Sequence, residues 1–313
     1  METINQTREM PGGIFSQDWW LDAVAPGGWG EVRVEKGGTL YARLPYVTRK
    51  KWGLRIMDMP PLTQTLGPHL RSYDGKYANR LAEEKELMTE LAGKLPPFDI
   101  FQQNFHYSIT NWLPFYWLGF KQTTRYTYVL EDLSDLGAVW DGFEKKIRTS
   151  IRKAEKQLTI RDDLDLDRFI ALNEMVFARR GRKPPYARSV IERIDHACRT
   201  RNRRKMFFAQ DATGRVHAAV YLVWDERSAY YLMGGADPEL RDSDATSLCL
   251  WEAIKFSSRA TRSFDFEGSM LENVEPFFRA FGGAQKPYFQ ITKIKSPIIG
   301  SAFDVWMRFR NKK

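Results

Sequence analysis

The chain has 313 residues, 43% of them hydrophobic and 14% aromatic, which is enough to bury the core of one large or two ordinary domains. Its two cysteines exclude a disulfide-stapled scaffold and predict a reducing compartment, which we take to be the cytoplasm. No apolar run approaches the roughly 20 residues of a membrane span, and the net charge of +9 favours polyanionic partners: nucleic acid, a nucleotide cofactor or an anionic lipid surface.

The first 125 residues predict a small unit of strands and helices. A short helix at 15–24 stops at Pro26-Gly27-Gly28. Alternating residues on either side of Gly37-Gly38 predict a hairpin. The expected strands are 31–34, 40–48, 54–57 and 100–107, and the expected charged helix is 79–94.

An aromatic run, NWLPFYWLGF, closes this first part at 111–120. Trp112 and Tyr116 belong to it. One interpretation is core packing beneath the first domain, and the other is the apolar wall of a substrate groove. Both interpretations stay open on the sequence, so Trp112 and Tyr116 are substrate-binding candidates.

The next segment predicts helices with a basic surface. A helix over 141–158 buries an apolar stripe and carries a basic stripe on another face, made of Lys145, Arg148, Arg152 and Lys156. The stripe is either a solvated face or a phosphate contact, since four cations at helical spacing create a local positive field. Arg148 and Arg152 are therefore further substrate-binding candidates. Helices at 166–180 and 187–200 follow.

From residue 206 the pattern becomes that of a sheet, with three strands joined by polar turns. A mostly apolar helix then begins near Ser243 or Asp244, both good N-cap residues, and runs to about residue 258. The expected strands are 206–210, 216–224, 229–234, 263–267 and 288–294, with a short helix at 274–281 and an amphipathic closing helix at 298–309.

The motif FDFEG at 264–268 is the main candidate for chemistry. Its alternation places Asp265 and Glu267 on one face at the end of a strand, where α/β sheets usually bind ligands. Transfer of an acyl group to an amine needs a proton acceptor, and these two carboxylates are the base candidates, with Tyr231 as a relay or donor. The alternative is that the carboxylates bond backbone N–H groups of the next loop. Oxyanion donors would be backbone N–H groups near Gly234-Gly235.

The order of elements, three meander strands followed by helix, strand, helix and strand, resembles the GNAT acyltransferase fold. TYVLEDLSDL (127–136) leading into FEKKIRTSIRKAEKQ (143–157) resembles the Fem family of peptidoglycan-bridge aminoacyltransferases. AYYLMGGADPELR (229–241), FDFEGS (264–269) and FFRAFGG (277–283) are similar to GNAT-type members of that group. The resemblance implies two GNAT-like domains, each an α/β (α+β) unit with a mixed, mostly antiparallel sheet flanked by helices. Their implied bounds are 1–125 and 126–295, with a closing helix at 296–313.

The resemblance also points to a cofactor loop, and the sequence departs from it there. Typical GNAT enzymes hold the coenzyme A pyrophosphate on a Q/R-x-x-G-x-G/A turn before the central helix. Here that stretch is Arg241-Asp242-Ser243-Asp244-Ala245-Thr246: both glycines are replaced, and two aspartates are added. The loop candidates for binding acyl-CoA or acetyl-CoA are Arg241, Ser243, Asp244, Ala245 and Thr246, together with Gly234 and Gly235. Fem-type enzymes use aminoacyl-tRNA instead, and the cations here would suit that donor.

Three functions follow from these observations. The first is an N-acyltransferase that moves an acyl or acetyl group from acyl-CoA to an amine of a cell-envelope or surface-polysaccharide precursor. The second is an aminoacyl-tRNA-dependent ligase of the Fem type, and the third is a degenerate scaffold that binds RNA or a protein partner without catalysis. The expected acceptor is a small-molecule amine or a nucleotide-sugar or lipid-linked precursor, with peripheral contact to the inner membrane surface. The four histidines are scattered without metal-ligand spacing, so no metal is expected.

Overall fold

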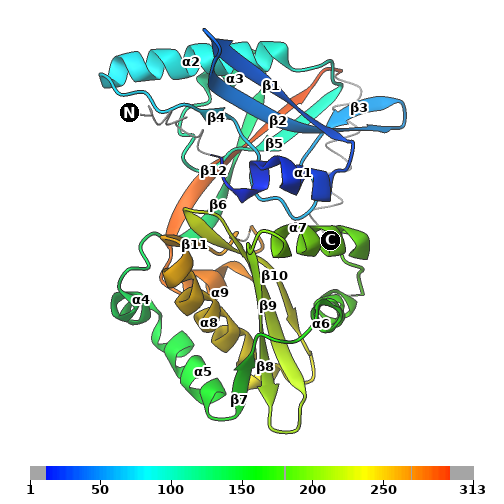
Figure 1. Cartoon of the computed structure of the whole chain (residues 1–313), viewed down its shortest axis with the longest axis vertical. Coiled ribbons are helices and arrows are strands. Elements are labelled where there is room, and N and C mark those ends of the chain that lie inside the picture. The colour runs from blue at the N-terminus through cyan, green and yellow to red at the C-terminus, as the bar shows by residue number, and fades with distance from the viewer. Residues whose placement is uncertain (1–11, 180, 269, 297–313) are drawn as a thin grey trace, which may run out of the picture. The chain divides into compact units, whose positions relative to one another are not determined.

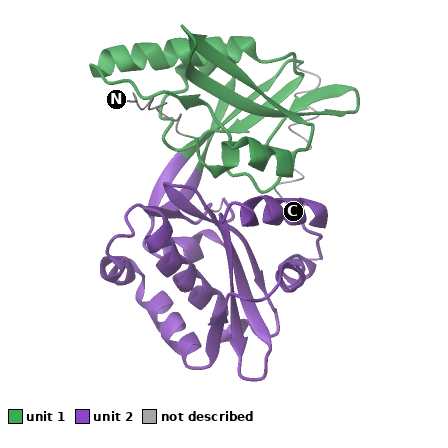
Figure 2. Cartoon of the chain, viewed as in Figure 1, with its two compact units in different colours: residues 1–125, 288–313 green, residues 126–287 purple. Residues whose placement is uncertain are grey.

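The computed structural model describes residues 12–179, 181–268 and 270–296, and the chain divides into two compact units (Figures 1 and 2). The first unit holds the chain up to Arg125 and again from Tyr288, and the second holds Tyr126–Pro287. The strand at 284–294, which the sequence placed in the second domain, therefore contributes its residues from Tyr288 onward to the first unit.

The first unit is a mostly antiparallel sheet with helix α2 packed on it. The strands follow the order β1-β2-β3-β5-β12, with β4 paired to β2, and only β3 and β5 run parallel. Leu87, Met88 and Leu91 form the buried face of α2. The elements are η1 (Ile14–Ser16), α1 (Asp18–Val24), β1 (Trp29–Lys36), β2 (Thr39–Lys51), β3 (Leu54–Met57), β4 (His69–Leu70), α2 (Tyr77–Lys94), β5 (Ile100–Asn104), α3 (Leu113–Trp117) and β12 (Ala284–Ile294).

The hairpin between β1 and β2 forms as the sequence predicts. Gly37 and Gly38 both have positive φ, 57° and 75°, which a two-residue turn of the I′ type requires and which glycine adopts without steric cost. Val34, Ala42 and Leu44 from the two strands are then buried together under α2.

The second unit is a six-stranded sheet in the order β6-β11-β10-β9-β8-β7. All neighbours that have a printed register are antiparallel except β10 and β11, which run parallel. Its elements are β6 (Lys121–Leu130), α4 (Leu136–Gly142), α5 (Lys145–Glu155), β7 (Leu158–Arg161), α6 (Leu166–Ala178), α7 (Arg188–Arg199), β8 (Arg204–Asp211), β9 (Val216–Trp224), β10 (Ser228–Ala236), η2 (Arg241–Ser243), α8 (Ala245–Ala260), β11 (Ser263–Asp265) and α9 (Glu275–Arg279).

Helices cover both faces of this second sheet (Figure 1). Helix α8 packs on β8 and β9 with α5 beside it, whereas α6 packs on β9 and β10. Every residue of β9 is consequently buried. This explains why β9 reads VHAAVYLVW, an almost continuous apolar run, rather than an alternating pattern.

The expected helix over 141–158 is in fact two helices. Helix α4 ends at Gly142, and α5 begins at Lys145 after Phe143 takes an extended conformation. The break lets the Phe143 ring enter the core, where it meets Trp251 and Phe281 edge to face at 5.4 and 5.2 Å.

The expected strand over 263–267 is also shorter, because β11 ends at Asp265 and Glu267 adopts a left-handed φ of 55°. Helix α9 and the meander strands lie where the sequence places them. The amphipathic segment 298–309 and most of the closing helix at 296–313 lie outside the described residues. Among the helices of the described chain, none combines the length and hydropathy that crossing a bilayer requires.

Candidate functional site

The candidate site lies where β10 and β11 part. The two strands pair in parallel only from Ser228 to Tyr230, whose partner is Asp265. Beyond this point β10 continues along β9 to Ala236. The chain after Asp265 instead follows β6, since Phe266 N–H donates to Tyr128 O at 3.0 Å. Tyr231 and Glu267 therefore lie just beyond the last paired residues of the two strands.

Gly268 holds the second branch against β6. Its φ is +55°, and a Cβ at this position would lie 2.4 Å from the backbone oxygen of Tyr126. Only glycine permits this approach and this conformation together. The end of the FDFEG motif is thus fixed to β6 while β10 leaves on the other side.

Asp265 is fully buried, and its Oδ1 anchors the turn. It accepts a hydrogen bond from Thr127 Oγ1 at 2.5 Å and another from the Glu267 backbone N–H at 2.7 Å. A carboxylate that bonds the N–H two residues onward forms an Asx-turn, which stabilises a local reversal of the chain. The structure thus gives Asp265 the alternative role raised from the sequence, that of bonding the next loop.

Glu267 has different surroundings. Its Oε1 is buried and accepts no hydrogen bond from the described residues. Burial raises the pKa of this carboxyl well above the ordinary value of 4.5, and the nearby charge of Asp265 raises it further. A carboxyl group with a raised pKa at the end of a strand has the properties of a general base or acid.

Tyr231 is close enough to this carboxyl group for its charge to affect the tyrosine hydroxyl. Burial raises the pKa of its hydroxyl, with smaller contributions from Tyr186, Cys249 and Glu267. The ring packs on Phe278 at 5.7 Å, and the hydroxyl folds back over Gly234, where a Cβ would lie 1.9 Å from it. Gly234, which has no Cβ, therefore leaves the space that the Tyr231 hydroxyl occupies.

The neighbouring Tyr230 has a scaffold role, because it is buried and its hydroxyl donates to Asp225 Oδ2 at 3.3 Å. Of the two tyrosines raised from the sequence, Tyr231 is the one whose hydroxyl pKa is raised in part by Glu267.

Helix α6 supplies two further features that sequence reasoning missed. Asn173 Nδ2 donates to the Gly234 carbonyl at 2.7 Å, and Tyr186 donates to Asn173 Oδ1 at 3.1 Å. Gly235 lies directly under the helix, since a Cβ there would meet Leu172 and Asn173 at 2.7 Å. Gly235 is thus needed for close packing of a helix on a strand. No local sequence signal pointed to Asn173, which is 61 residues from Gly234 in the chain.

The loop before α8 is organised around Asp244. This residue has a left-handed φ of 59°, and its carboxylate accepts from Ser150 Oγ at 3.0 Å and from Lys153 Nζ at 3.0 Å. Lys153 also donates to the Asp242 backbone oxygen at 2.6 Å. Asp244 thus keeps the backbone conformation expected of the missing glycine, and α5 holds its side chain.

The residues of this loop do not fit a coenzyme A pyrophosphate in the way that the resemblance implied. Both cations near this loop are paired with its acids, because Lys153 lies 3.0 Å from the Asp244 carboxylate and Arg241 lies 3.8 Å from the Asp242 carboxylate. The Ser243 hydroxyl donates to Leu240 O at 2.7 Å. A doubly charged phosphate would therefore meet two carboxylates where it needs donors. Ala245 is buried, while Arg241 is exposed and Thr246 half-buried.

The remaining substrate-binding candidates make other contacts. Arg148 pairs with Asp141 at 3.5 Å, and Arg152 lies 5.5 Å from the Trp140 ring. Trp112 and Tyr116 belong to the first unit, where their rings contact edge to face at 5.5 Å. Their role in binding stays a prediction.

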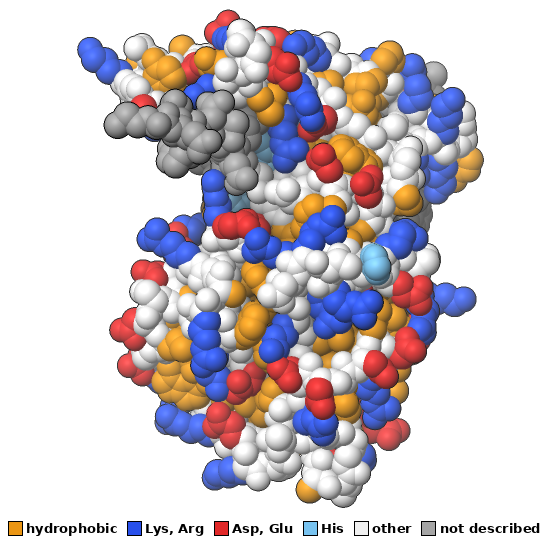
Figure 3. All heavy atoms as spheres, in the orientation of Figure 1, with side chains coloured by type: hydrophobic (Ala, Val, Ile, Leu, Met, Phe, Trp, Pro, Cys, Tyr) orange, Lys and Arg blue, Asp and Glu red, His pale blue; other side chains and the backbone are white. Residues whose placement is uncertain are grey.

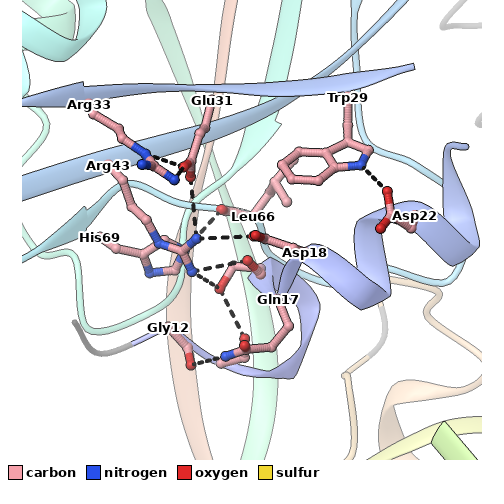
Figure 4. Close-up of polar contacts among 12 residues, drawn as sticks. Gly12, Gln17, Asp18, Asp22, Trp29, Glu31, Arg33, Arg43, Leu66 and His69 are labelled. Carbon is pink, nitrogen blue, oxygen red and sulfur yellow. Dashed lines mark hydrogen bonds and ion pairs between the residues drawn. The ribbon is translucent and has the colours of Figure 1, made fainter. Parts of the chain in front are cut away.

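A second polar cluster, in the first unit, is internally paired (Figure 4). The guanidinium of Arg43 on β2 lies 3.3 Å from Glu31 and 3.7 Å from Asp18, and it donates to the Ser16 backbone oxygen at 3.0 Å. His69 contacts Leu66 O at 3.2 Å. The cluster ties α1 to the β1–β2 hairpin, and its charges are offset within it.

The surface charge is mixed. On the face shown in Figure 3, Lys and Arg side chains are interspersed with Asp and Glu rather than gathered in one field. Within the described chain no three His, Cys, Asp or Glu side chains are placed to hold a metal ion.

Comparison with known proteins agrees with this fold. Residues 142–279 match the family model described as the acetyltransferase (GNAT) domain. No curated protein sequence matches the chain. The fold is similar to that of FemX, with a TM-score of 0.65 and 14% identity over 92% of this chain and 96% of that one.

Two other solved structures share the fold at a lower score. One is the C-terminal domain of a protein described as a lysylphosphatidylglycerol synthetase from Agrobacterium fabrum, with a TM-score of 0.52 and 13% identity over 85% of this chain and 84% of that one. The other is a tandem GNAT protein from the clavulanic acid biosynthesis pathway, with a TM-score of 0.50 and 13% identity over 86% and 83%. Residues 142–279 thus form a domain that matches the acetyltransferase (GNAT) family, and the chain as a whole shares the fold of FemX and of the tandem GNAT protein.

Proposed function

We propose that the second unit transfers an acyl group from an activated carbonyl donor to an amine of a cell-envelope or surface-polysaccharide precursor in the cytoplasm. The observation that carries the proposal is the Glu267 carboxyl group, which is buried without a hydrogen-bond partner at Oε1 among the described residues and has a raised pKa. It lies on one branch of the β10–β11 divergence, beside a tyrosine on the other branch.

The reaction places a defined demand on Glu267. The amine nitrogen attacks the carbonyl carbon, a C–N bond forms, and the bond to the leaving sulfur or oxygen breaks. The nitrogen must lose one proton, which the Glu267 carboxylate accepts, and the leaving atom must gain one, which the Tyr231 hydroxyl can donate. Tyr231 then regains a proton from Glu267 or solvent, so the proton count closes.

Asp265 has a positioning role in this scheme. Its Oδ1 accepts hydrogen bonds from Thr127 and from the Glu267 backbone, which fixes the backbone of the proposed base. Its negative charge also raises the pKa of Glu267, which makes that carboxylate a stronger proton acceptor near neutral pH.

Two donors are to be compared. GNAT domains in general imply acyl-CoA, including acetyl-CoA, and the family match supports it. The loop 241–246 favours the second candidate, an aminoacyl-tRNA-dependent transfer of the Fem type, because Asp242 and Asp244 oppose a pyrophosphate there. Lys145 and Lys156 on α5 lie within 4 Å of no carboxylate in the described part of the chain, so they are available to a polyanionic donor.

The acceptor class rests on the comparisons. FemX and the lysylphosphatidylglycerol synthetase domain share the fold, and the second name denotes a protein that makes an aminoacylated lipid. The second name supports a lipid-linked acceptor, whereas the choice of an amine rests on the acetyltransferase domain match and on the proposed base.

The test uses the full chain with a labelled acyl group on either acetyl-CoA or aminoacyl-tRNA, and an amino-sugar nucleotide as acceptor. Mass spectrometry of the acceptor reads N-acylation directly. We expect turnover with one donor and its loss in Glu267→Gln, while Glu272→Gln, an exposed acid five residues on, stays active. Full turnover in Glu267→Gln would overturn the assignment of the base, and no turnover of the wild-type chain with either donor would overturn the donor pair.

A further inference from the structure

Four large apolar side chains of the first unit are exposed together. Leu113, Tyr116 and Trp117 belong to α3, and Leu118 follows it; we call these four residues the α3 patch. Tyr116 is 59% exposed and Trp117 60%, although the adjacent Phe115 and Phe120 are buried in the core. The aromatic run in the sequence is therefore divided between a core half and a surface half.

Among residues 12–179, 181–268 and 270–296, the fold gives no internal reason for the exposed half. Helix α3 has only five residues and satisfies its packing through Pro114 and Phe115 on the other side. Phe115 packs edge to face on Phe105 at 5.0 Å and on Phe120 at 5.2 Å. Contiguous exposed apolar side chains on a soluble domain usually mark a contact surface.

Lysines surround the α3 patch. Lys85 Nζ lies 5.7 Å from the Trp117 ring centroid, and Lys293 Nζ donates to the Leu118 backbone oxygen at 2.6 Å. Lys121 follows the patch and is exposed. In the described chain none of these three lysines has a carboxylate oxygen within 4 Å.

The acids of the neighbouring helix α2 are largely engaged elsewhere. Glu84 pairs with Arg80 at 3.8 Å, Glu86 with Lys36 at 3.9 Å, and Glu90 with Lys94 at 2.7 Å. The charge beside the patch is therefore positive, and it suits an anionic partner.

We infer that the α3 patch docks on the surface of an anionic lipid bilayer. Tyr and Trp side chains are favoured at the level of the lipid headgroups, where an apolar ring and a polar tip are both accommodated. Leu113 and Leu118 would enter the acyl boundary, while the three lysines meet lipid phosphates. The inference rests on the first unit alone and does not depend on the acyl-transfer chemistry.

The test is co-sedimentation of the full chain with vesicles of phosphatidylcholine, with and without phosphatidylglycerol. We expect binding to the anionic vesicles that weakens as salt is added, because salt screens the lysines. The variant Trp117→Ser/Leu118→Ser, which leaves the substrate-binding candidate Tyr116 in place, should lose at least about tenfold in vesicle affinity, the equivalent of about 1.4 kcal/mol. Its circular dichroism and its acyl transfer to a soluble acceptor should be unchanged.

The matched control is Trp52→Ser. Trp52 is 79% exposed at the β2–β3 turn and has Lys51 above its ring at 4.3 Å, so it is the same pair of residue types without the surrounding patch. It should bind vesicles as the wild-type chain does. The inference is overturned if the wild-type chain ignores anionic vesicles, if Trp52→Ser loses as much affinity as the patch variant, or if sedimentation shows that the patch joins two copies of the chain instead.

Discussion

Glu267 and Asp244 are two acids of the second unit that share an unusual backbone conformation but have different neighbours. Both have left-handed φ values, 55° and 59°, which non-glycine residues adopt at a cost. Asp244 meets a lysine ammonium and a serine hydroxyl at 3.0 Å each. Glu267 meets a second carboxylate, Asp265, and has a raised pKa.

The comparison indicates that the surroundings of a carboxyl group decide whether its role is structural or chemical. The Asp244 charge is offset by Lys153, so this carboxylate joins α5 to the start of α8. The Glu267 charge is not offset, so its carboxylate binds a proton more readily than an ordinary glutamate does. Backbone strain alone would not have distinguished them.

The sharpest way to break this comparison is to neutralise each acid without changing its size. Glu267→Gln should lower kcat by about 10²–10⁴, because the amine loses its proton acceptor. Asp244→Asn should change kcat by less than about threefold, since the proposed chemistry does not use it. Steady-state kinetics of N-acyl product formation measure both, and equal losses in the two variants would contradict the assignment.

Thr127→Val tests the support beneath Glu267. The substitution keeps the shape of a buried side chain and removes a donor to Asp265 Oδ1, so we expect a loss of about 1–3 kcal/mol in the free energy of unfolding. The Glu267 turn should also loosen, with kcat falling about tenfold at an unchanged KM. Urea unfolding and kinetics provide the two readouts. Thr124→Val, on the same strand outside the proposed site, serves as the control and should retain kcat.

Asp244→Gly tests whether the altered loop 241–246 weakens the binding of coenzyme A. Glycine adopts the left-handed conformation freely, which offsets part of the lost bonds to Ser150 and Lys153, so stability should change by less than about 1 kcal/mol. Removing one carboxylate and freeing Lys153 should raise the affinity for coenzyme A several-fold, about 1 kcal/mol in binding. Calorimetric titration measures it, and an unchanged affinity would show that charge in this loop is not the obstacle.

The smallest expected effect is the dependence of stability on pH. Because the pKa of Glu267 is higher in the folded chain than the ordinary 4.5, the unfolded chain loses this proton first as pH rises. The stability that the protonated Glu267 contributes is therefore fully present below about pH 4.5. It is lost as pH rises through the pKa that Glu267 has in the folded chain. Glu267→Gln lacks this loss, so its Tm should exceed that of the wild-type chain by a few degrees at pH 8, with the gap closing near pH 4.5. A gap that is constant across pH would contradict the raised pKa.

The same pKa sets the direction of the activity profile. As Glu267 deprotonates with rising pH, kcat/KM should rise through the folded pKa and then level, and this limb should be missing from the residual activity of Glu267→Gln.

The parts of the fold that follow from local pattern could be predicted from the sequence. The β1–β2 hairpin is determined by Gly37-Gly38, and the meander strands by their alternation or apolar runs between polar turns. The family likeness of the second unit was visible in the same segments, and the GNAT domain match confirms it.

What could not be predicted depends on pairs that are distant in the chain. Thr127 and Asp265 are 138 residues apart, and Lys153 and Asp244 are 91 apart. Nothing at either end of these pairs indicates its partner. The end of β11 at Asp265 was not predicted either. It depends on how β11 pairs with β6 on one side and with β10 on the other, which the FDFEG alternation does not show.

The last strand of the first unit comes after the whole of the second unit in the chain. Strand β12 pairs with β5 from Gln290↔Asn104 to Ile294↔Ile100, and Phe105 N–H donates to Phe289 O at 2.8 Å. During synthesis from the N-terminus, this edge of β5 stays unpaired until β12 emerges from the ribosome. That happens only after the whole of Tyr126–Pro287 has been made. The second unit can thus complete its fold first, and an expression fragment cut at the first boundary would leave β5 with an open edge that invites aggregation.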